Sequence, residues 1–558
     1  MNDIKKMLKR NKRYISYIKS YLKYEFMVCI LLLISSVVGL ISPLLYQIII
    51  DNVLLLKQMY LLKYIIVLLS ICFLWTLAIN FVVGSINTYL NQIVSIRIRS
   101  DLMNHILKLR MEEVTESKIG DYIAKISEDV ATVTGFLTGT FISAASDTFN
   151  VLAVGLFMVM FNKKLAIATF ILCVSQIFAT KLFSNKIRDN QRDIREKSSL
   201  NLGFLNTILS TIKHTKALGK EKYIQRNYLS VLKSLKNVSF KSFFLQYSYG
   251  LATSLISFLG SMFILMIGIS EIIKGNMTIG ILFVFDTLTN SFCQFAGKLV
   301  DLSVVLQSSL ISFERINSIF ELPIEKYEKR DELCTYDIRF KDVYFGYKNH
   351  QVFQGLNINF EQGHSYAIVG ATGSGKSTMA YLLVGFYKQS KGNIFIGGKK
   401  IEDLGIIEVR KKITIVLQEV MVFAGTLEEN IRYGNKRATT DEVREVAYIA
   451  GLDEFLEDKT VGFSMYIEEN GANLSGGQRQ RICLARALLR NTDIYVFDEV
   501  LSAIDVYTRN SVYARLERYL KDKTRIYITH DQELVKEIPE IIVVENEIAR
   551  MISKDVLE

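Results

Sequence analysis

The stretch Gly370–Thr378 reads GATGSGKST; it follows the short apolar run SYAIV (365–369) and precedes a helical stretch. The pattern G-x-x-x-x-G-K-[ST] between a strand and a helix is a phosphate-binding loop. Its glycines let backbone N–H groups surround phosphates, and the helix N-terminus adds partial positive charge. The sequence therefore predicts an α/β nucleotide-binding domain around this loop.

The chemistry expected at this loop extends to a second, downstream strand. Lys376 is expected to reach the β- and γ-phosphates, and the Ser377 hydroxyl to bind Mg²⁺. The apolar run Ile494–Phe497 ends in Asp498 and Glu499. Such an aspartate helps to hold Mg²⁺ in phosphoryl-transfer enzymes, and the adjacent glutamate is placed to polarise the attacking water as general base. The predicted ligands are ATP and Mg²⁺.

The first 300 residues contain long runs without charge, whereas a bilayer core needs only about 20 apolar residues per helix. The first run is too long for the apolar region of a cleaved signal peptide. Six spans are predicted: 26–50, 64–96, 130–162 with Asp147 inside, 165–185 with Lys181 inside, 242–270, and 275–297 with Asp286 inside.

Charge divides the 558 residues in the same way. Residues 1–324 hold 35 basic and 20 acidic residues, and residues 325–558 hold 32 and 36. A basic, apolar half joined to a balanced half indicates a membrane domain (1–322) fused to a soluble domain (323–558). Half of the chain is hydrophobic, which excludes disorder and collagen. No nucleic-acid partner is expected, and six cysteines without a CxxC pair suggest neither a zinc site nor a disulfide framework.

The orientation of the chain in the membrane follows from the distribution of basic residues and from the expected use of ATP. Residues 1–25 carry eight Lys/Arg, which favours a cytoplasmic N-terminus, and a domain that uses ATP must lie in the cytosol. The long inner connections, 97–130 and 181–245, are predicted to be helices that project beyond the bilayer. Their turns are expected near Ile119–Tyr122 and Asn206–Ile208, where they would dock on the soluble domain.

Asp147 and Asp286 are ionisable residues inside predicted spans. Such residues are costly in a membrane and normally face the bundle interior. One interpretation is that they line a substrate cavity and favour a cationic cargo. The other is a structural hydrogen bond to a neighbouring helix, or a helix end placed slightly wrong. The sequence leaves both open.

The stretch LSGGQRQR (474–481) resembles the signature motif of the ATP-binding cassette (ABC) ATPases. Other pieces match the same family in order. Tyr347 is similar to the aromatic that stacks on adenine, and Gln418 to the Q-loop glutamine near Mg²⁺ and the attacking water. Asp505, in Ser502–Asp505, resembles the D-loop aspartate, and His530 the switch histidine that contacts the γ-phosphate.

The resemblance and the phosphate loop together give a set of expected site residues. The catalytic residues are Glu499, His530 and Gln418, and the Mg²⁺ ligands are Ser377, Gln418 and Asp498. The nucleotide-binding residues are Tyr347, Gly370, Thr372, Gly373, Ser374, Gly375, Lys376, Ser377, Thr378, Ser475, Gly476, Gly477, Gln478 and Asp505.

The whole chain resembles a half-size ABC exporter: an α-helical membrane bundle of six transmembrane helices, like the type IV exporters, plus an α/β P-loop NTPase domain. The resemblance implies a homodimer, in which Ser475 and Gly477 of one copy contact the γ-phosphate of ATP held by Lys376 of the other. This chain would also suit the intact member of a heterodimer. No amino-terminal cysteine peptidase domain is seen, so leader cleavage is not expected.

The implied function is an ATP-hydrolysing, multi-pass exporter in a bacterial cell membrane, with its nucleotide-binding domain in the cytoplasm. Its cargo is expected to be a peptide or another amphipathic substrate. The alternatives are a lipid or multidrug exporter or flippase and, less favoured, an importer with an exporter-like fold. An ABC protein without a transport function would lack the six fused spans.

Overall fold

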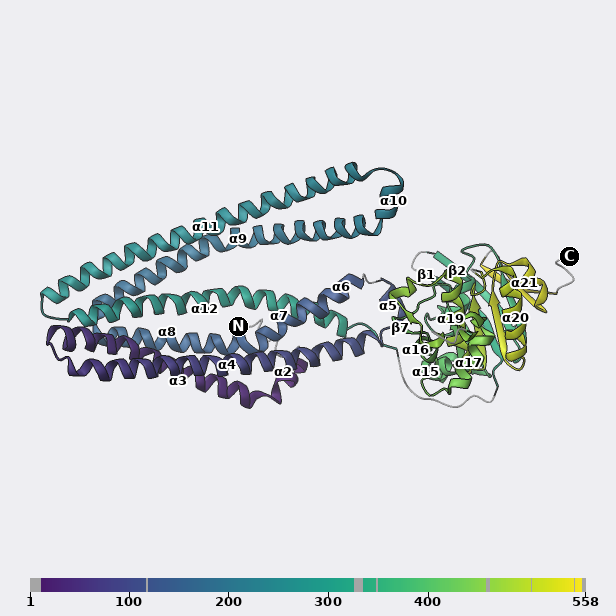
Figure 1. Cartoon of the computed structure of the whole chain (residues 1–558), viewed down its shortest axis with the longest axis horizontal. Coiled ribbons are helices and arrows are strands. Elements are labelled where there is room, and N and C mark those ends of the chain that lie inside the picture. Colours follow the sequence, from purple (N-terminus) through teal and green to yellow (C-terminus); the bar gives the residue numbers. More distant parts are fainter. Residues whose placement is uncertain are drawn as a thin grey trace. The chain divides into compact units, whose positions relative to one another are not determined.

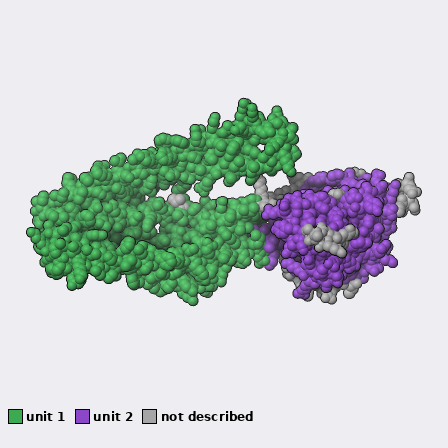
Figure 2. All heavy atoms as spheres, in the orientation of Figure 1, with its two compact units in different colours: residues 1–104, 119–321 green, residues 105–118, 322–558 purple. Residues whose placement is uncertain are grey.

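The computed structural model describes residues 12–116, 119–325, 335–347, 350–457, 462–502, 504–545 and 547–553. They fall into two compact units, which are residues 1–104 with 119–321 and residues 105–118 with 322–558 (Figure 2). The boundary expected after residue 322 lies one residue earlier, and the segment 105–118 belongs to the second unit, which the sequence did not suggest. Cys334 and Ala503 lie outside the described residues.

The first unit is built from long helices. Among the described residues, six helical segments are long and apolar enough to cross a membrane: Leu22–Leu55, Tyr60–Ile106, Gly120–Phe161, Lys163–Ser210, Glu221–Ile273 and Ile279–Phe320. This confirms the six predicted spans. The helices are α2 (Lys12–Lys19), α3 (Leu22–Ile48), α4 (Tyr60–Ile106), α6 (Ile119–Ala124), α7 (Val130–Gly135), α8 (Phe141–Phe161), α9 (Lys163–Ser210), α10 (Ile212–Ala217), α11 (Glu221–Ile273) and α12 (Ile279–Phe320), with π-helical turns at Ile49–Leu55, Lys125–Asp129 and Phe136–Thr140.

Helices α9 and α11 run side by side over most of their length (Figure 1). Polar contacts join them at intervals: the Gln176 amide donates to the Ser257 hydroxyl at 2.7 Å, and the hydroxyls of Thr180 and Tyr249 are 3.1 Å apart. Helix α12 packs mainly against α8 and α3. A buried cluster that includes Phe285 of α12 unites α8, α9, α11 and α12.

Both predicted turns of the inner connections were wrong by about a helical turn or more. The first reversal is made by α5 (Met111–Glu116), and the second by α10. Helix α10 ends at Ala217, and Gly219, two residues later, has a φ of +60°. The N–H groups of Gly219 and Lys220 bond back to the carbonyls of Lys216 and Thr215, at 3.1 and 3.2 Å. This is a Schellman motif, which favours glycine because of the left-handed backbone.

The second unit contains two main sheets. The larger has the strand order β12-β11-β3-β10-β9-β6, in which only β12 pairs antiparallel with its neighbour; the smaller, antiparallel sheet has the order β2-β1-β4-β5, and β7 pairs with β8. The strands are β1 (Ile338–Tyr347), β2 (His350–Phe360), β3 (Ser365–Val369), β4 (Lys391–Ile396), β5 (Lys399–Lys400), β6 (Ile413–Val416), β7 (Gly425–Thr426), β8 (Tyr466–Ile467), β9 (Ile494–Asp498), β10 (Thr524–Ile528), β11 (Glu540–Glu545) and β12 (Ile548–Ser553).

Helices surround the parallel sheet, and two buried apolar clusters form its core. The helices of this unit are α5 (Met111–Glu116), α13 (Lys376–Leu383), α14 (Ile401–Leu404), α15 (Ile406–Lys412), α16 (Leu427–Arg432), α17 (Thr440–Ile449), α18 (Asp453–Glu457), α19 (Gly476–Leu488), α20 (Val506–Tyr519) and α21 (Gln532–Glu537). The expected α/β domain is therefore present.

Candidate nucleotide site

The parallel strands β3, β10, β9 and β6 are consecutive neighbours, so their carboxyl ends meet at one edge of the sheet. Four predicted pieces follow these ends: the phosphate loop, His530, Asp498 with Glu499, and Gln418. Ligands of open α/β sheets bind at this edge. A pocket of about 320 Å³ lies here, lined by Tyr347, His350, Val352, Thr372, Gly373, Gly375, Lys376, Ser377, Thr378, Gln418, Glu499 and His530.

Two glycines of the phosphate loop have no room for a side chain. Gly370 has φ +154°, and a Cβ there would lie 2.3 Å from the Val544 carbonyl oxygen. Gly375 has φ +104°, and its Cβ would lie 2.5 Å from Cγ1 of Val352. The loop therefore keeps its backbone close to the neighbouring strands and leads directly into α13.

Lys376 is the first residue of α13 and is buried. Its ammonium donates to the carbonyl oxygens of Gly370 and Ala371, each at 2.9 Å. Burial lowers the pKa of the Lys376 ammonium, while the carboxylates of Glu499 and Asp498 oppose this shift. The ammonium is thus held against the loop that we expect to bind phosphates.

Glu499, Gln418 and His530 are brought together as a group. The Gln418 amide donates to Oε2 of Glu499 at 2.7 Å, and Nε2 of His530 lies 3.2 Å from its Oε1. Glu499 has φ +53°, a strained conformation for a residue with a side chain, of the kind that clusters at functional sites. Each oxygen of the Glu499 carboxylate therefore has its own side-chain partner.

Two buried polar atoms in this region have no hydrogen-bond partner among the described residues: Oδ2 of Asp498 and Oγ of Ser374. Burial raises the pKa of Asp498, and a hydrogen bond from Ser377 opposes the shift. A buried carboxylate oxygen beside a serine hydroxyl is a suitable donor set for Mg²⁺, which prefers oxygen ligands. These residues fit the metal that the sequence suggested.

Tyr347 lies at the end of β1, and the residue is 37% exposed. Its hydroxyl lies 3.2 Å from the hydroxyl of Thr378 on α13. The pocket also includes His350, to which the sequence assigned no role. His350 pairs with Tyr347 across β1 and β2, so the hairpin register was the signal that could have found it.

The signature residues and Asp505 do not line this pocket. Ser475 caps α19: its hydroxyl accepts from the Gln478 N–H at 3.2 Å, and the Gln478 side chain accepts from the Ser475 N–H at 2.9 Å. Asp505 caps α20 by accepting from the Thr508 N–H at 3.0 Å, which lowers the pKa of Asp505. Within one chain, Ser475, Gly476, Gly477, Gln478 and Asp505 are exposed on helix N-termini or partly so.

In the first unit, Asp147 and Asp286 have different surroundings. Asp147 of α8 lies 3.9 Å from the ammonium of Lys298 on α12. Asp286 is exposed on α12, and its backbone carbonyl accepts a hydrogen bond from the Asn290 amide at 3.1 Å. Lys298 is on the same helix as Asp286 but lies about 18 Å farther along it, at 1.5 Å of rise per residue.

Comparison with known proteins agrees with this geometry. Residues 26–295 match the family model of the ABC transporter transmembrane region, and residues 353–502 match that of the ABC transporter.

The chain belongs to the ABC transporters.

This ABC transporter is 28% identical over 537 residues to an ATP-dependent lipid A-core flippase of Syntrophus aciditrophicus, covering 93% of this chain and 86% of the flippase. It is 27% identical over 544 residues to the alpha-haemolysin translocation ATP-binding protein HlyB of Escherichia coli O157:H7, covering 95% and 76%. Its fold matches a solved bacterial Atm1-family ABC exporter with ATP bound, at a TM-score of 0.83 and 20% identity over 97% of this chain and 96% of that one.

The family and the fold establish an ATPase coupled to transport across a membrane, with the half-size exporter architecture. The helices that the first unit contributes make the ABC transporter a multi-pass membrane protein.

Proposed function

We propose that this ABC transporter is a homodimeric exporter that moves a peptide or another amphipathic substrate out of the cytoplasm of a bacterium, across the cell membrane. ATP hydrolysis would require Mg²⁺, held by Ser377 and Asp498 with Gln418 nearby. The observation that carries the choice of cargo is a polar face on α12.

Helix α12 presents hydrogen-bonding side chains in a stripe. Asp286, Asn290 and Gln294 recur at every fourth position, and all three are exposed in the single chain. At 100° per residue they share one side of the helix. Such groups are costly against acyl chains, so this side faces a water-filled path or a second copy. A cargo rich in hydrogen-bonding groups suits it better than a purely apolar one.

The charges in this region favour a positive group on the cargo. The carboxylate of Asp147 already has Lys298 as an ion-pair partner. Within the part of the chain that the structure describes, the Asp286 carboxylate forms no ion pair. We therefore assign recognition of a cationic group to Asp286, and a structural role to Asp147.

The transport cycle is a shift between two populations. ATP would bind best where the phosphate loop of one copy meets Ser475 and Gly477 of the other, because only there are its phosphates contacted from both sides. Glu499, oriented by Gln418 and His530, would act as general base toward the attacking water. Loss of the γ-phosphate would then remove contacts and let the copies separate.

A lipid or multidrug cargo is the second candidate, supported by one feature of α11. Four exposed aromatic residues, Phe240, Phe243, Phe244 and Tyr247, follow one face of the helix where its uncharged run begins. Lys233, Lys236 and Lys241 lie just to the cytosolic side. Aromatic rings and lysines at a membrane boundary suit anionic lipid headgroups.

ATP hydrolysis by the reconstituted protein distinguishes these candidates. The assay compares cationic and neutral peptides of equal length, phospholipids and hydrophobic drugs as stimulators. We expect cationic peptides to stimulate most strongly, and Asp286→Asn to raise their half-maximal concentration by about tenfold, because an ionic contact is lost.

Asp301→Asn is the matched control, because Asp301 is an exposed carboxylate on the same helix but lies outside the predicted span 275–297. Stimulation by lipids alone, or an unchanged response in Asp286→Asn, would contradict the peptide proposal. Uptake rather than efflux, measured with inverted vesicles, would favour the importer.

A further inference from the structure

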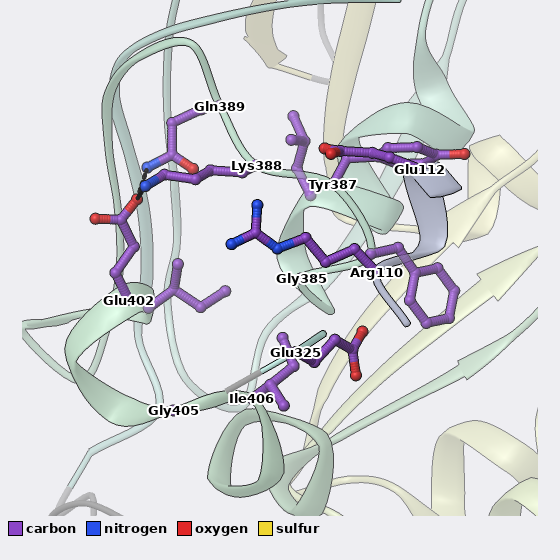
Figure 3. A pocket seen from close by; sticks show the side chains of 13 residues that line it. Arg110, Glu112, Glu325, Gly385, Tyr387, Lys388, Gln389, Glu402, Gly405 and Ile406 are labelled. Carbon is purple, nitrogen blue, oxygen red and sulfur yellow. Dashed lines mark hydrogen bonds and ion pairs between the residues drawn. The ribbon is translucent and has the colours of Figure 1, made fainter. Parts of the chain in front are cut away.

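The second unit contains a pocket of about 260 Å³. It is lined partly by the segment around α5, where the chain reverses, and partly by the nucleotide-binding domain. Figure 3 shows this pocket, with the Arg110 side chain extended toward its middle and Lys388 and Gln389 bonded to Glu402 on one side. Its wall is formed by Arg110, Glu112, Glu325, Leu382, Gly385, Phe386, Tyr387, Lys388, Gln389, Ile401, Glu402, Gly405 and Ile406.

The α5 segment is fixed to its unit from one side. Leu109 forms a β-bridge with Ile324, and the Glu325 N–H donates to the Lys108 carbonyl at 2.7 Å. The Glu325 carboxylate accepts two hydrogen bonds from the Arg410 guanidinium, at 2.7 and 2.8 Å. These contacts hold residues 108–110, while the other side of the segment borders the pocket.

Tyr387 also lines this pocket, and its ring contacts Tyr347. The ring centroids of Tyr347 and Tyr387 are 5.2 Å apart, and the ring planes are inclined at 87°. The ring centroid of Phe345 lies 5.8 Å from that of Tyr387. Edge-to-face pairs of this kind have a preferred geometry. Tyr347 is the residue on which we expect adenine to stack, so Tyr387 lies between the base-binding ring and the pocket that α5 borders.

We propose that Tyr387 is a positioning residue that makes the order of the α5 segment depend on the bound base. A base stacked on Tyr347 fixes that ring, and the fixed ring restrains Tyr387 and with it the wall facing Arg110. A ligand with phosphates but no base leaves Tyr347 unrestrained. The proposal rests on the nucleotide-binding role of this site. It adds that the order of α5 responds to the bound base independently of the phosphates.

Amide hydrogen exchange of residues 105–116 in the full-length, reconstituted protein tests this. Mg-ADP carries the base and has no γ-phosphate to be hydrolysed. Mg-pyrophosphate carries phosphates but lacks the base. At saturating ligand, we expect ADP to slow exchange in this segment by about threefold or more, and pyrophosphate to leave it unchanged.

Substitutions locate the effect. Tyr387→Ala, and Tyr387→Leu as a second variant in case the alanine protein does not fold, are expected to abolish the slowing by ADP. Tyr387→Phe keeps the ring edge and should retain it. Tyr381→Leu is the matched control. The ring centroid of Tyr381 lies 6.2 Å from that of Tyr387 and 5.9 Å from that of Phe386, but Tyr381 does not line the pocket.

Equal slowing by pyrophosphate, or unchanged slowing by ADP in folded Tyr387→Ala and Tyr387→Leu, overturns the inference. A separate measurement of ADP binding distinguishes this from failure of the proposed function. If the wild-type protein does not bind ADP, the nucleotide site itself is wrong; if it binds ADP without base-dependent slowing, only the role of Tyr387 is wrong.

Discussion

At the scale of single residues, the hydrolytic site depends on how one carboxylate is held. Glu499 receives a hydrogen bond from Gln418 at 2.7 Å and lies 3.2 Å from His530. Its own N–H is bonded to the Ile528 carbonyl of β10 at 3.0 Å. Glu499 is therefore held through both its backbone and its side chain, which suits the role of general base that we propose for it.

Glu499→Gln should keep nucleotide binding and reduce hydrolysis by about 10²–10⁴-fold, the usual contribution of a general base. The amide keeps the shape of the carboxylate but accepts a proton poorly. Phosphate release and ATP binding, measured on the same preparation, give the two quantities. Glu361→Gln, at an exposed glutamate outside the pocket, is the control, and rapid hydrolysis by Glu499→Gln would contradict the assigned role.

At the scale of elements, the start of α12 is tied to the end of the first span. Thr278 caps α12 by accepting from the Ile281 N–H, and its hydroxyl donates to Asp51 at 2.6 Å. Asp51 also accepts from the Gly280 N–H at 2.9 Å. A Cβ on Gly280 would lie 2.6 Å from Oδ2 of Asp51, so any side chain here would displace that carboxylate. Two segments more than 220 residues apart thus share one helix cap.

Asp51→Ala should lower stability by about 1 kcal/mol, the typical cost of losing a capping side chain. Asp51→Asn should cost less, because its amide oxygen still accepts a hydrogen bond. Thermal unfolding in detergent compares the two, with Asp301→Ala as the control for removing a carboxylate elsewhere on α12. Equal melting temperatures for Asp51→Ala and the control would show that the cap contributes little.

At the scale of the whole molecule, the phosphate loop and the signature stretch do not form one pocket within a chain. Ser475 is at the start of α19 with its side chain used in a capping box, and the small residues beside it leave that helix N-terminus open to an anion. A second copy would bring this terminus to the phosphates held by Lys376. In the homodimer that we propose, the site is therefore complete only when two chains combine.

Two inactive variants should therefore restore activity when mixed. In a heterodimer of Lys376→Ala with Gly477→Asp, one composite site has both wild-type parts and the other has neither. Random association of equal amounts gives mixed dimers in about half of the population, so we expect up to about a quarter of wild-type hydrolysis. The measurement needs co-expression of two differently tagged chains.

The two homodimers, each purified alone, are the controls for this experiment and should be inactive. Absence of any activity in the isolated heterodimer, despite correct assembly, would mean that both sites must be intact together. Full activity of either variant alone would contradict the composite site.

Sequence reasoning failed where distant segments meet. The turn at α10 was placed too early, although Gly219 followed by Lys220 carried the signal of a helix end. The turn at α5 had no such signal, because residues 108–110 are held by Ile324 and Glu325, more than 200 residues away. The partner of Asp147 was missed for the same reason: Lys298 lies on a different helix.

The chain's own order of residues determined the phosphate loop, because its glycines, lysine and following helix are contiguous and act locally. It also determined the six spans, because the thickness of the bilayer sets their length. Only the tertiary structure decided that Gln418 and His530 flank Glu499, that Tyr387 contacts Tyr347, and that residues 105–118 belong with the nucleotide-binding domain. These contacts join residues that are distant in the sequence. They depend on the order of strands in the sheet and on the packing of distant segments, about which local periodicity carries no information.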